Sequence, residues 1–514
     1  MGRPLLHCYF LNSFQRNIHA GCKPKILENP AAGHNAAMQL NFIGHHAIAS
    51  LSGRTLPVID PSDGQPFDEI QRSDARDIDA AVRAARACFD GPWSALSAAE
   101  RGRLLMALSR LVAEHADELA AMEQRDCGKP TAQARADAAA LARYFEFYAG
   151  ACDKLHGQTL PYQHGYSVLT WREPHGVTGH VIPWNYPMQI FGRSVGGALA
   201  AGNCCVVKPS EDACLSLLRV AQLAADVGFP AGCINIVTGH GHEVGDALAR
   251  HPGVDHISFT GSPRVGTLIQ QAAAERHCPV TLELGGKSPQ ILFADADLDA
   301  ALPVVINAIV QNAGQTCSAG SRVLIEQAIY DTVLERLGEA FTQLRVGPAA
   351  LDLDLGPLIR QSQQQRVWDF LSDAQASHIP AVAQGVVVDD APESGFYQAP
   401  VLLADVPATH RLAQEEVFGP VLAAMPFRDE DHAVELANAT RFGLVAGVWT
   451  QGGARQFRMA RRVKSGQVFI NHYGAGGGVE LPFGGVKSSG HGREKGFEAL
   501  YGFTTLKTVA VRHG

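Results

Sequence analysis

One cysteine stands in a segment whose composition would leave its thiol open to a reactant. Cys317 lies within residues 312–320, a run of small and polar residues that contains no bulky apolar side chain. An accessible thiol of this kind can act as a nucleophile once it is ionised. The same composition also suits a helix start in which the cysteine only fills space. The segment alone therefore leaves both interpretations open.

Two further polar residues follow runs of strand character, where side chains emerge at the carboxyl edge of a sheet. Glu283 is followed closely by a glycine pair, which lets another group approach the backbone. A carboxylate in this position could be a general base, or it could simply pair with nearby Lys287. Asn185 lies in a turn bounded by two prolines. A fixed amide donor is what an oxyanion requires, although the turn could also be only a strand exit.

Composition excludes several classes of protein. The 514 residues, 46% hydrophobic and 18% charged, suggest two to four domains with large buried cores. Lys and Arg number 43 against 51 Asp and Glu, a net charge of −8 that leaves no basic surplus for binding nucleic acid. The eleven cysteines are odd in number and thinly spread, which indicates a reducing compartment and a cytoplasmic protein. No apolar run reaches the roughly 18 residues of a membrane helix.

The first 40 residues predict an N-terminal extension, expected to be disordered. Within residues 1–37, four basic residues stand against the single acid Glu28. This bias faintly suggests a transit peptide, so the mitochondrial matrix is the minor alternative for localisation. The segment shows no amphipathic repeat, however. A disordered tail or an upstream start ahead of Met38 is the other interpretation.

The spacing of strand-like and helical segments predicts an α/β fold. Short β-rich runs at 177–182, 204–207, 233–237, 256–259 and 280–284 alternate with helical segments at 213–227, 242–250 and 264–276. This alternation is typical of a doubly wound parallel sheet, which binds ligands at the carboxyl ends of its strands. A second α/β unit is expected over 289–427.

Three other segments carry distinct predictions. A capping-box pair, Ser97 and Glu100, precedes apolar residues at helical spacing and predicts one long amphipathic helix that ends at Gly128. The strands expected at 166–172 and 504–511 have no obvious partner in either unit. We expect these two strands to pair across subunits.

Seven ordered motifs carry a resemblance to a known family. They are Pro183-Trp184-Asn185, Lys208-Pro209-Ser210-Glu211, Phe259-Thr260-Gly261-Ser262, Glu283-Leu284-Gly285-Gly286-Lys287-Ser288-Pro289, Gly314-Gln315-Thr316-Cys317, Glu415-Glu416-Val417-Phe418-Gly419-Pro420 and Pro482-Phe483-Gly484-Gly485-Val486-Lys487. From about Asn41 onward the chain resembles the aldehyde dehydrogenase superfamily, in its non-acylating, NAD(P)-dependent branch. Cys317 follows Glu283 by 34 residues, a spacing that agrees with the family.

The resemblance implies an architecture. It implies a Rossmann-type cofactor domain over 41–155 and 175–285, and an α/β catalytic domain over 286–485. Residues 156–174 and 486–514 would form a small β oligomerisation element and a C-terminal arm. The implied assembly is a homodimer or a homotetramer.

The resemblance also implies a reaction in which an aldehyde is oxidised to its carboxylate. Cys317 would attack the aldehyde carbon to give a thiohemiacetal, whose oxyanion is held by the Asn185 amide and the Cys317 backbone N–H. The resulting thioester would be hydrolysed by a water that Glu283 deprotonates. Together these three residues form the implied catalytic set.

Cofactor contacts are implied in the same way. The implied set is Ile182, Trp184, Lys208, Ser210, Glu211, Gly241, Gly261, Ser262, Gly266, Leu284, Glu416 and Phe418. NAD is expected in preference to NADP, because a carboxylate at Glu211 accepts hydrogen bonds from free ribose hydroxyls and repels a 2′-phosphate. No metal is expected, since the 21 histidines show no ligand spacing. Cys204, Cys205 and Cys233 are interpreted as small core residues.

The substrate pocket implied by the resemblance holds Tyr186, Arg193, Gln311, Thr316 and Ser318. Arg193 aligns with an arginine that meets the substrate carboxylate in succinate-semialdehyde-type members, which would suit a semialdehyde. Gln311 stands where those members place a second arginine, and Arg193 could instead be structural. The Gly-rich stretch at 471–481 would line the entrance. The broad grouping is similar to betaine-aldehyde and amino-aldehyde enzymes, so a semialdehyde or an amino-aldehyde is expected, without a single named substrate.

Three other functions fit the residues less well. A catalytically weak structural or binding protein of the same fold would lack Cys317 or Glu283, and both are present. An acylating, coenzyme-A-using reductase keeps the cysteine but lacks the hydrolytic carboxylate. A Cys-His hydrolase would leave the Lys208 and Glu416 motifs without a purpose.

Overall fold

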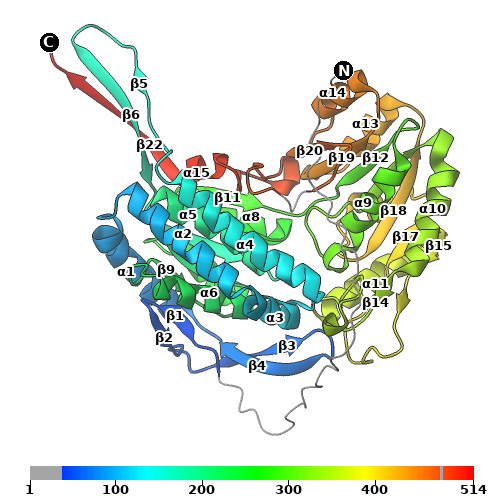
Figure 1. Cartoon of the computed structure of the whole chain (residues 1–514), viewed down its shortest axis with the longest axis horizontal. Coiled ribbons are helices and arrows are strands. Elements are labelled where there is room, and N and C mark those ends of the chain that lie inside the picture. The colour runs from blue at the N-terminus through cyan, green and yellow to red at the C-terminus, as the bar shows by residue number, and fades with distance from the viewer. Residues whose placement is uncertain (1–37, 475–477) are drawn as a thin grey trace, which may run out of the picture. The chain divides into compact units, whose positions relative to one another are not determined.

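An eight-stranded sheet forms the first layer of the fold (Figure 1). The structure is a computed structural model and describes residues 38–474 and 478–514; the expectations for the N-terminal extension lie outside them. The strand order is β2-β1-β9-β8-β7-β10-β11-β21. The bounds are β1 Asn41–Ile43, β2 His46–Ile48, β7 Val177–Ile182, β8 Cys204–Pro209, β9 Ile234–Ile236, β10 His256–Thr260, β11 Val280–Glu283 and β21 Gly490–His491.

The order of the five central strands reverses beside β7. Strands β7, β8 and β9 follow one another in one direction, and β10 and β11 then continue from the other side of β7, all in parallel. Right-handed crossovers place the helices that follow β7 and β8 on one face and those that follow β9 and β10 on the other. The doubly wound sheet expected from the sequence is confirmed. The reversal puts a ligand-binding crevice at the carboxyl ends of β7 and β10.

A second sheet of seven strands carries the other half of the fold. Its order is β15-β17-β18-β13-β12-β19-β20, parallel except for β15. The bounds are β12 Pro289–Leu292, β13 Arg322–Glu326, β15 Ala381–Gln384, β17 Val401–Leu403, β18 Val421–Phe427, β19 Val445–Trp449 and β20 Gln467–Ile470. The expected second α/β unit thus continues past residue 427, because β19 and β20 complete its sheet. Two-stranded pairs join β3 Thr55–Asp60 to β4 Gln65–Gln71, and β14 Arg345–Val346 to β16 Val386–Val387.

The two strands without an expected partner pair with each other. β22 Thr504–Arg512 runs antiparallel to β6 Tyr166–Pro174 along its whole length, and β5 Thr159–Leu160 adds a third strand to β6. Each strand therefore has a partner within the chain that the sequence analysis did not identify, and pairing across subunits stays a prediction. A partner 330 or more residues away along the chain left no local signal in the sequence.

Fifteen α-helices cover the sheets in the described residues. They are α1 Ala75–Cys88, α2 Ala98–Glu114, α3 Ala116–Cys127, α4 Thr131–Ala151, α5 Pro187–Ala201, α6 Leu215–Asp226, α7 Asp246–Arg250, α8 Pro263–Ala274, α9 Leu298–Val310, α10 Tyr330–Gln343, α11 Gln361–Ala376, α12 Arg411–Gln414, α13 Glu430–Asn438, α14 Gly453–Arg462 and α15 Glu498–Gly502. Helix α5 is buried on nearly every side, because it packs on β7 and β8 and is covered by α2 and α4 (Figure 1). Most of its residues are accordingly small or apolar, although it also carries the buried Arg193 and Ser194.

The long helix expected from Ser97 to Gly128 is two helices. The capping box of Ser97 and Glu100 is confirmed at the start of α2, and Gly128 ends α3 in a left-handed conformation. At His115 the backbone leaves the helical region, with φ −98° and ψ 15°, and one helix passes into the next. The sequence pattern did not predict this break, because the apolar spacing continues across it.

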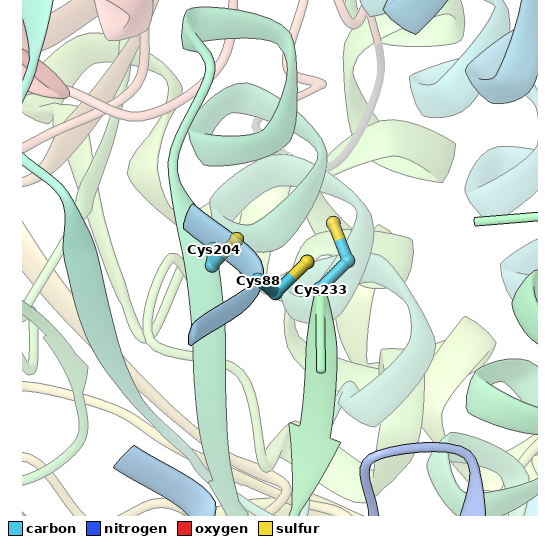
Figure 2. Close-up of side chains that lie close together, drawn as sticks. All are labelled: Cys88, Cys204 and Cys233. Carbon is cyan, nitrogen blue, oxygen red and sulfur yellow. The ribbon is translucent and has the colours of Figure 1, made fainter. Parts of the chain in front are cut away.

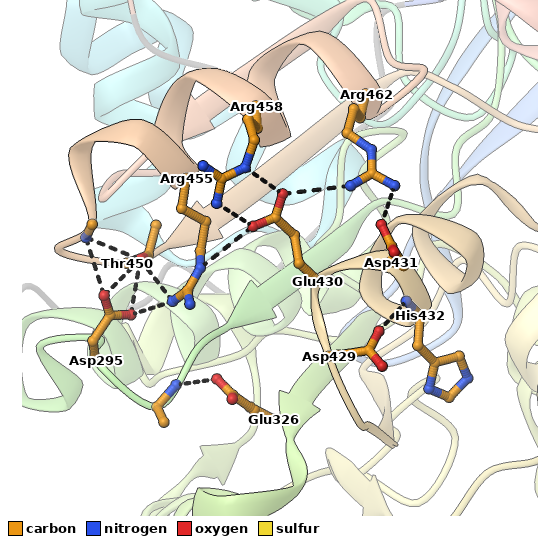
Figure 3. A network of polar contacts seen from close by, with 12 residues as sticks. Asp295, Glu326, Asp429, Glu430, Asp431, His432, Thr450, Arg455, Arg458 and Arg462 are labelled. Carbon is orange, nitrogen blue, oxygen red and sulfur yellow. Dashed lines mark hydrogen bonds and ion pairs between the residues drawn. The ribbon is translucent and has the colours of Figure 1, made fainter.

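A network of surface ion pairs joins α13 to α14 and to the end of β12. Glu430 and Asp431 pair with Arg458 and Arg462, and Asp295 contacts Thr450 and Arg455 (Figure 3). Exposed pairs of this kind each contribute at most about 1 kcal/mol, so the network orients these helices more than it stabilises them. Among the helices at 38–474 and 478–514, none combines the length and apolar character that crossing a membrane requires.

Candidate active site

The carboxyl ends of three neighbouring strands meet at one cavity. Asn185 follows β7, Gly261 and Ser262 follow β10, and Glu283 ends β11, where it lies in register with Thr260. The cavity measures about 560 Å³. It is also lined by Cys317, which belongs to the second α/β unit and follows α9 in the chain. The crevice that the topology requires is therefore present, and residues from both sheets line it.

Eight of the residues expected from the sequence line this cavity. They are Trp184, Asn185, Gly261, Ser262, Glu283, Cys317, Glu416 and Phe418. The three implied catalytic residues are among them. The other expected cofactor and substrate residues lie beside or behind the cavity wall.

The loop before Cys317 is held in an uncommon backbone conformation. Asn312 and Ala313 both have positive φ, 50° and 52°, and Gly314 has φ 74°. A side chain at Gly314 would collide with the backbone of Gly419, 2.2 Å from the position of its Cβ. Strain of this kind is found at functional sites, where the surroundings enforce it. The cysteine therefore sits at the end of a loop whose shape is imposed by distant contacts.

Hydrogen bonds tie Asn185 to the same loop. Its Nδ2 donates to the carbonyl of Gln315 at 2.9 Å, and Asn312 Nδ2 donates to the carbonyl of Asn185 at 2.9 Å. Asn185 is buried. The amide and the nucleophile loop are thus fixed to each other.

Cys317 is a half-buried free thiol. Burial raises the pKa of its thiol to about 11; the Arg193 guanidinium opposes this, while the Glu416 and Glu283 carboxylates add to it. The helix-start interpretation is not what the structure shows, because Cys317 follows a strained loop and faces the cavity. Nucleophilic use of this thiol requires that its proton be removed when substrate is present.

Glu283 is buried with no hydrogen bond to either carboxylate oxygen from the described residues. Burial raises the pKa of Glu283 well above its usual range, and the nearby Glu494 carboxylate adds to this, whereas Arg193 opposes it. The alternative pairing with Lys287 is not formed: within residues 38–474 and 478–514 the Lys287 Nζ is also without a hydrogen-bond partner. A carboxyl with a raised pKa that faces a cavity is suited to moving a proton.

Glu416 and the glycine pair after Glu283 meet closely. Glu416 Oε1 accepts a hydrogen bond from the Gly286 N–H at 3.1 Å, and a Cβ on Gly285 would lie 2.3 Å from Glu416 Oε2. Burial raises the pKa of Glu416 to about 7, although the Gly286 N–H opposes this. On the same wall Phe418 packs edge-on to Trp184, with ring centroids 5.4 Å apart. The glycines are therefore needed for the carboxylate to reach the cavity.

Lys208 and Glu211 form a second cluster just beyond β8. Lys208 Nζ contacts Glu211 Oε2 at 2.8 Å, and Glu211 Oε1 lies 3.2 Å from His240 Nδ1. Burial would raise the pKa of Glu211, but the Lys208 ammonium outweighs this and holds it at about 2. Gly241 lies beside the pair, since a Cβ there would be 4.0 Å from Lys208 Nζ. The Glu211 carboxylate is therefore ionised.

Five other expected cofactor residues shape the backbone around these groups. Ser262 caps α8 by accepting a hydrogen bond from the Val265 N–H, and Ser210 is buried at the end of β8. Ile182 and Leu284 are buried at the ends of their strands. A Cβ on Gly266 would lie 2.6 Å from Leu284, so glycine lets α8 approach the sheet.

Arg193 is committed to another residue of the chain. Its Nε lies 2.5 Å from Glu494 Oε2, its Nη2 donates to Thr260 Oγ1, and its guanidinium packs over the Phe483 ring. Arg193 and Glu494 are both buried. Of the two interpretations of Arg193, the geometry favours the structural one, because its guanidinium is already paired with Glu494.

Tyr186, Gln311 and Thr316 form a hydrogen-bonded group beside the nucleophile. Gln311 Nε2 donates to the Tyr186 hydroxyl at 2.7 Å, and that hydroxyl lies 3.0 Å from Thr316 Oγ1. The carbonyl of Ser318 accepts a hydrogen bond from the Tyr473 hydroxyl. These residues hold the loop around Cys317.

Several residues at the site carried no usable signal in the sequence. Glu494 partners Arg193, and Lys129 lies over the Tyr186 ring. Arg360 and Arg366, from the region of α11, also line the cavity. Only distance in space, not spacing along the chain, connects them to the catalytic motifs.

Comparison with known proteins identifies the family of this chain. The model of the Aldehyde dehydrogenase family matches residues 48–509. An aldehyde dehydrogenase of Emericella nidulans is 39% identical over 95% of this chain and 98% of its own length. A structure from Burkholderia cenocepacia, placed among the aldehyde dehydrogenases, is 73% identical with a TM-score of 0.92, covering 92% of this chain and all of its own. The NAD⁺ complex of a Bacillus cereus aldehyde dehydrogenase is 38% identical with a TM-score of 0.90, covering 92% and 96%.

The fold, the cavity and these similarities define a class of oxidoreductase that acts on the aldehyde group and uses NAD(P). The chain belongs to the aldehyde dehydrogenase family. The resemblance inferred from the seven motifs is confirmed.

Proposed function

We propose that this chain oxidises its aldehyde through a covalent thioester on Cys317. The observation that carries the proposal is that Cys317, Glu283 and Asn185, from separate elements, line one cavity. Cys317 attacks the aldehyde carbon, and the Asn185 amide donates to the oxygen that becomes negative. Glu283 takes a proton from the water that hydrolyses the thioester and releases the carboxylate product.

The residues of the cavity fit a dinucleotide cofactor. The N-terminus of α8, with Gly261 and Ser262, offers backbone N–H groups to a pyrophosphate. The Glu416 carboxylate reaches the cavity only because Gly285 has no side chain, which suits a ribose diol. When bound, NAD(P) supplies the hydride acceptor. Trp184 and Phe418 then form an apolar wall that keeps water from this part of the site.

We propose NAD as the preferred cofactor, with NADP less favoured. The ionised Glu211 carboxylate, held by Lys208, would accept hydrogen bonds from ribose hydroxyls and repel a 2′-phosphate. The expectation that no metal takes part in the reaction stays a proposal.

Proton transfer within the site depends on Cys317, Glu283 and Arg193. Burial raises the pKa of the Cys317 thiol to about 11 and the pKa of the Glu283 carboxyl well above its usual range. The buried Arg193 guanidinium opposes both shifts. Its positive charge favours the thiolate and then the carboxylate as each is needed.

An apolar aldehyde fits the surroundings of the nucleophile best. Cys317 packs against a small apolar cluster that consists of Leu444, Val445, Phe469, Tyr473 and Phe483. Arg193, the residue expected to bind a substrate carboxylate, already forms an ion pair with Glu494. We therefore favour an apolar or aromatic aldehyde over the semialdehyde or amino-aldehyde suggested by the sequence.

A homodimer or homotetramer remains our proposal for the assembly. The sheet of β5, β6 and β22 leaves large apolar side chains in solvent, among them Trp171, Leu506 and Val511, each about half exposed. Large apolar side chains left exposed in this way are typical of a protein–protein interface. The domain boundaries implied by the resemblance are proposed unchanged.

We propose a cytoplasmic location, with the mitochondrial matrix as the alternative. All nine cysteines in the described part of the chain are free thiols. A reducing compartment keeps thiols in that state.

The experiment is a measurement of NADH formation by the purified chain with apolar, cationic and carboxylate-bearing aldehydes, repeated with NADP⁺. We expect the highest kcat/KM with apolar aldehydes and NAD⁺. Cys317→Ala should abolish turnover while the chain still binds NAD⁺, measured by calorimetry. Undiminished turnover in that variant would refute the covalent route. Preference for carboxylate-bearing aldehydes would return Arg193 to a substrate-binding role.

A further inference from the structure

Three cysteines converge inside the cofactor half of the molecule, away from the candidate active site. Cys88 is the last residue of α1, Cys204 the first residue of β8, and Cys233 immediately precedes β9 (Figure 2). Their Sγ atoms all lie within 4.8 Å of one another, and all three residues are buried. We call these three residues the cysteine triad. It brings together thiols from three elements that the sequence separates by 116 and 29 residues.

The triad lies at the opposite end of β8 from the cofactor contacts. β8 begins at Cys204 and ends at Pro209, after Lys208. At about 3.3 Å per residue, this separates the triad from the Lys208 and Glu211 cluster by more than about 10 Å. The reaction proposed above makes no use of these thiols.

Backbone geometry fixes the three thiols in place. The Cys205 N–H donates to the Cys233 carbonyl at 2.8 Å, and the Cys204 N–H donates to the Gly176 carbonyl at 3.0 Å. Gly232 has φ 89°, and a Cβ there would lie 2.3 Å from the Ala84 carbonyl oxygen and 3.2 Å from Cys88 Cβ. Glycine at this position is therefore what allows α1 to bring Cys88 against Cys233.

The helix that supplies Cys88 changes form directly after it. Residues Phe89–Trp93 make a π-helical turn, in which Gly91 leaves the helical region. Such turns are rare and are frequent at functional sites. This irregular segment begins directly after Cys88.

The separations of the sulfur atoms match a three-coordinate metal. Ligands at about 2.3 Å around a trigonal centre are about 4.0 Å apart, which is compatible with the spacing observed here. In the described part of the chain no further His, Cys, Asp or Glu joins this group. Structural zinc sites and iron–sulfur clusters use four protein ligands. A set of three thiolates instead suits a soft, monovalent d¹⁰ cation.

We propose that the cysteine triad of Cys88, Cys204 and Cys233 is a binding site for Cu⁺. Binding forms three Cu–S bonds and releases the thiol protons to solvent. The bound ion ties α1 to the two strands it covers. This assignment revises the sequence-based interpretation, in which Cys204 and Cys233 only fill the core, because that interpretation did not include Cys88.

The test is an anaerobic titration of the full chain with Cu⁺ against a chromogenic Cu⁺ chelator. Cys317→Ala is the parent, so that the thiol in the cavity does not contribute. We expect one Cu⁺ per chain to be withheld from the chelator. Cys88→Ala, Cys204→Ala and Cys233→Ala should each weaken retention at least about 10-fold, as the loss of a ligand requires. Cys205→Ala is the matched control, because the neighbouring side chain in a strand points to the other face.

X-ray absorption on the Cu⁺-loaded parent gives a readout that does not depend on how the variants fold. Three sulfur neighbours around copper support the site, whereas nitrogen or oxygen neighbours, or fewer than three sulfurs, would overturn it. Equal retention by the parent and Cys88→Ala would also overturn it. So would a preference for Zn²⁺ in the same competition.

Discussion

A buried charge cluster beneath the active-site turn offers a sharp test of how this site is supported. Lys129 Nζ contacts Glu123 Oε1 at 2.5 Å and also pairs with Asp137, and all three side chains are buried. The same Nζ lies 4.2 Å from the centre of the Tyr186 ring. The Glu123 carboxyl accepts a hydrogen bond from the Met188 N–H at the start of α5. The cluster therefore connects α3 and α4 to the turn that carries Asn185.

Replacing Lys129 by methionine should destabilise the fold strongly. Burial raises the pKa of Glu123 well above its usual range, the Lys129 ammonium opposes this shift, and Asp137 adds to it. Lys129→Met keeps the apolar stem but leaves the Asp137 carboxylate buried without its cation. Removing one partner of a buried pair costs about 3–5 kcal/mol. We expect a loss of that size in the free energy of unfolding.

The assay is urea unfolding followed by tryptophan fluorescence and circular dichroism. Lys154→Met is the matched control, because Lys154 pairs with Asp153 in solvent, with side chains 64% and 51% exposed. Exposed pairs contribute at most about 1 kcal/mol. Adding Asp137→Asn to Lys129→Met should recover most of the loss, since the uncompensated charge is then gone. If Lys129→Met behaves like the control, or if the second substitution restores nothing, the reasoning is wrong.

The remaining predictions concern the chemical steps. Burial raises the pKa of Glu283, and a base must be deprotonated, so kcat should rise with pH through a midpoint well above the usual range of a glutamate. Glu283→Gln should remove this rise with pH and lower kcat by about 10²–10⁴-fold. It should also let an acyl-enzyme accumulate, which mass spectrometry detects. A pH profile that Glu283→Gln leaves unchanged would speak against the base assignment. Asn185→Ala should lower kcat by about 10²–10³-fold, the usual cost of an oxyanion donor, while the affinity for NAD⁺ measured by calorimetry stays the same; a change confined to KM would contradict that role.

Local patterns in the sequence predicted the elements that depend on local interactions. The run at 177–182 coincides with β7, and the strands at 256–259 and 280–284 agree with β10 and β11 within one residue. Each is a short, buried, β-rich segment that ends in a turn, so its neighbours along the chain specify it. Asn185 follows such a segment and Glu283 ends one, which is why their meeting at one sheet edge was foreseeable. Cys317 instead follows helix α9 and a loop, so the strand pattern did not place it at that edge.

Contacts between distant parts of the chain could not be predicted in this way. Arg193 appeared free to meet a substrate because Glu494, its partner, lies 301 residues further on. The pairing of β6 with β22 was missed for the same reason. A single sequence records the type of each side chain but not which opposite charge or strand edge the fold will bring to it.

The loop before Cys317 shows why such distant contacts matter for the chemistry. Two non-glycine residues, Asn312 and Ala313, adopt positive φ there, at a cost of about 1–3 kcal/mol each. The strain persists because the Asn312 N–H donates to Gln133 Oε1 and its amide donates to the carbonyl of Asn185. Each such bond contributes about 0.5–1.5 kcal/mol. Contacts from α4 and from the turn after β7 therefore both stabilise the loop. The oxyanion donor and the nucleophile are therefore positioned by the same hydrogen bonds, and a change that moves one displaces the other.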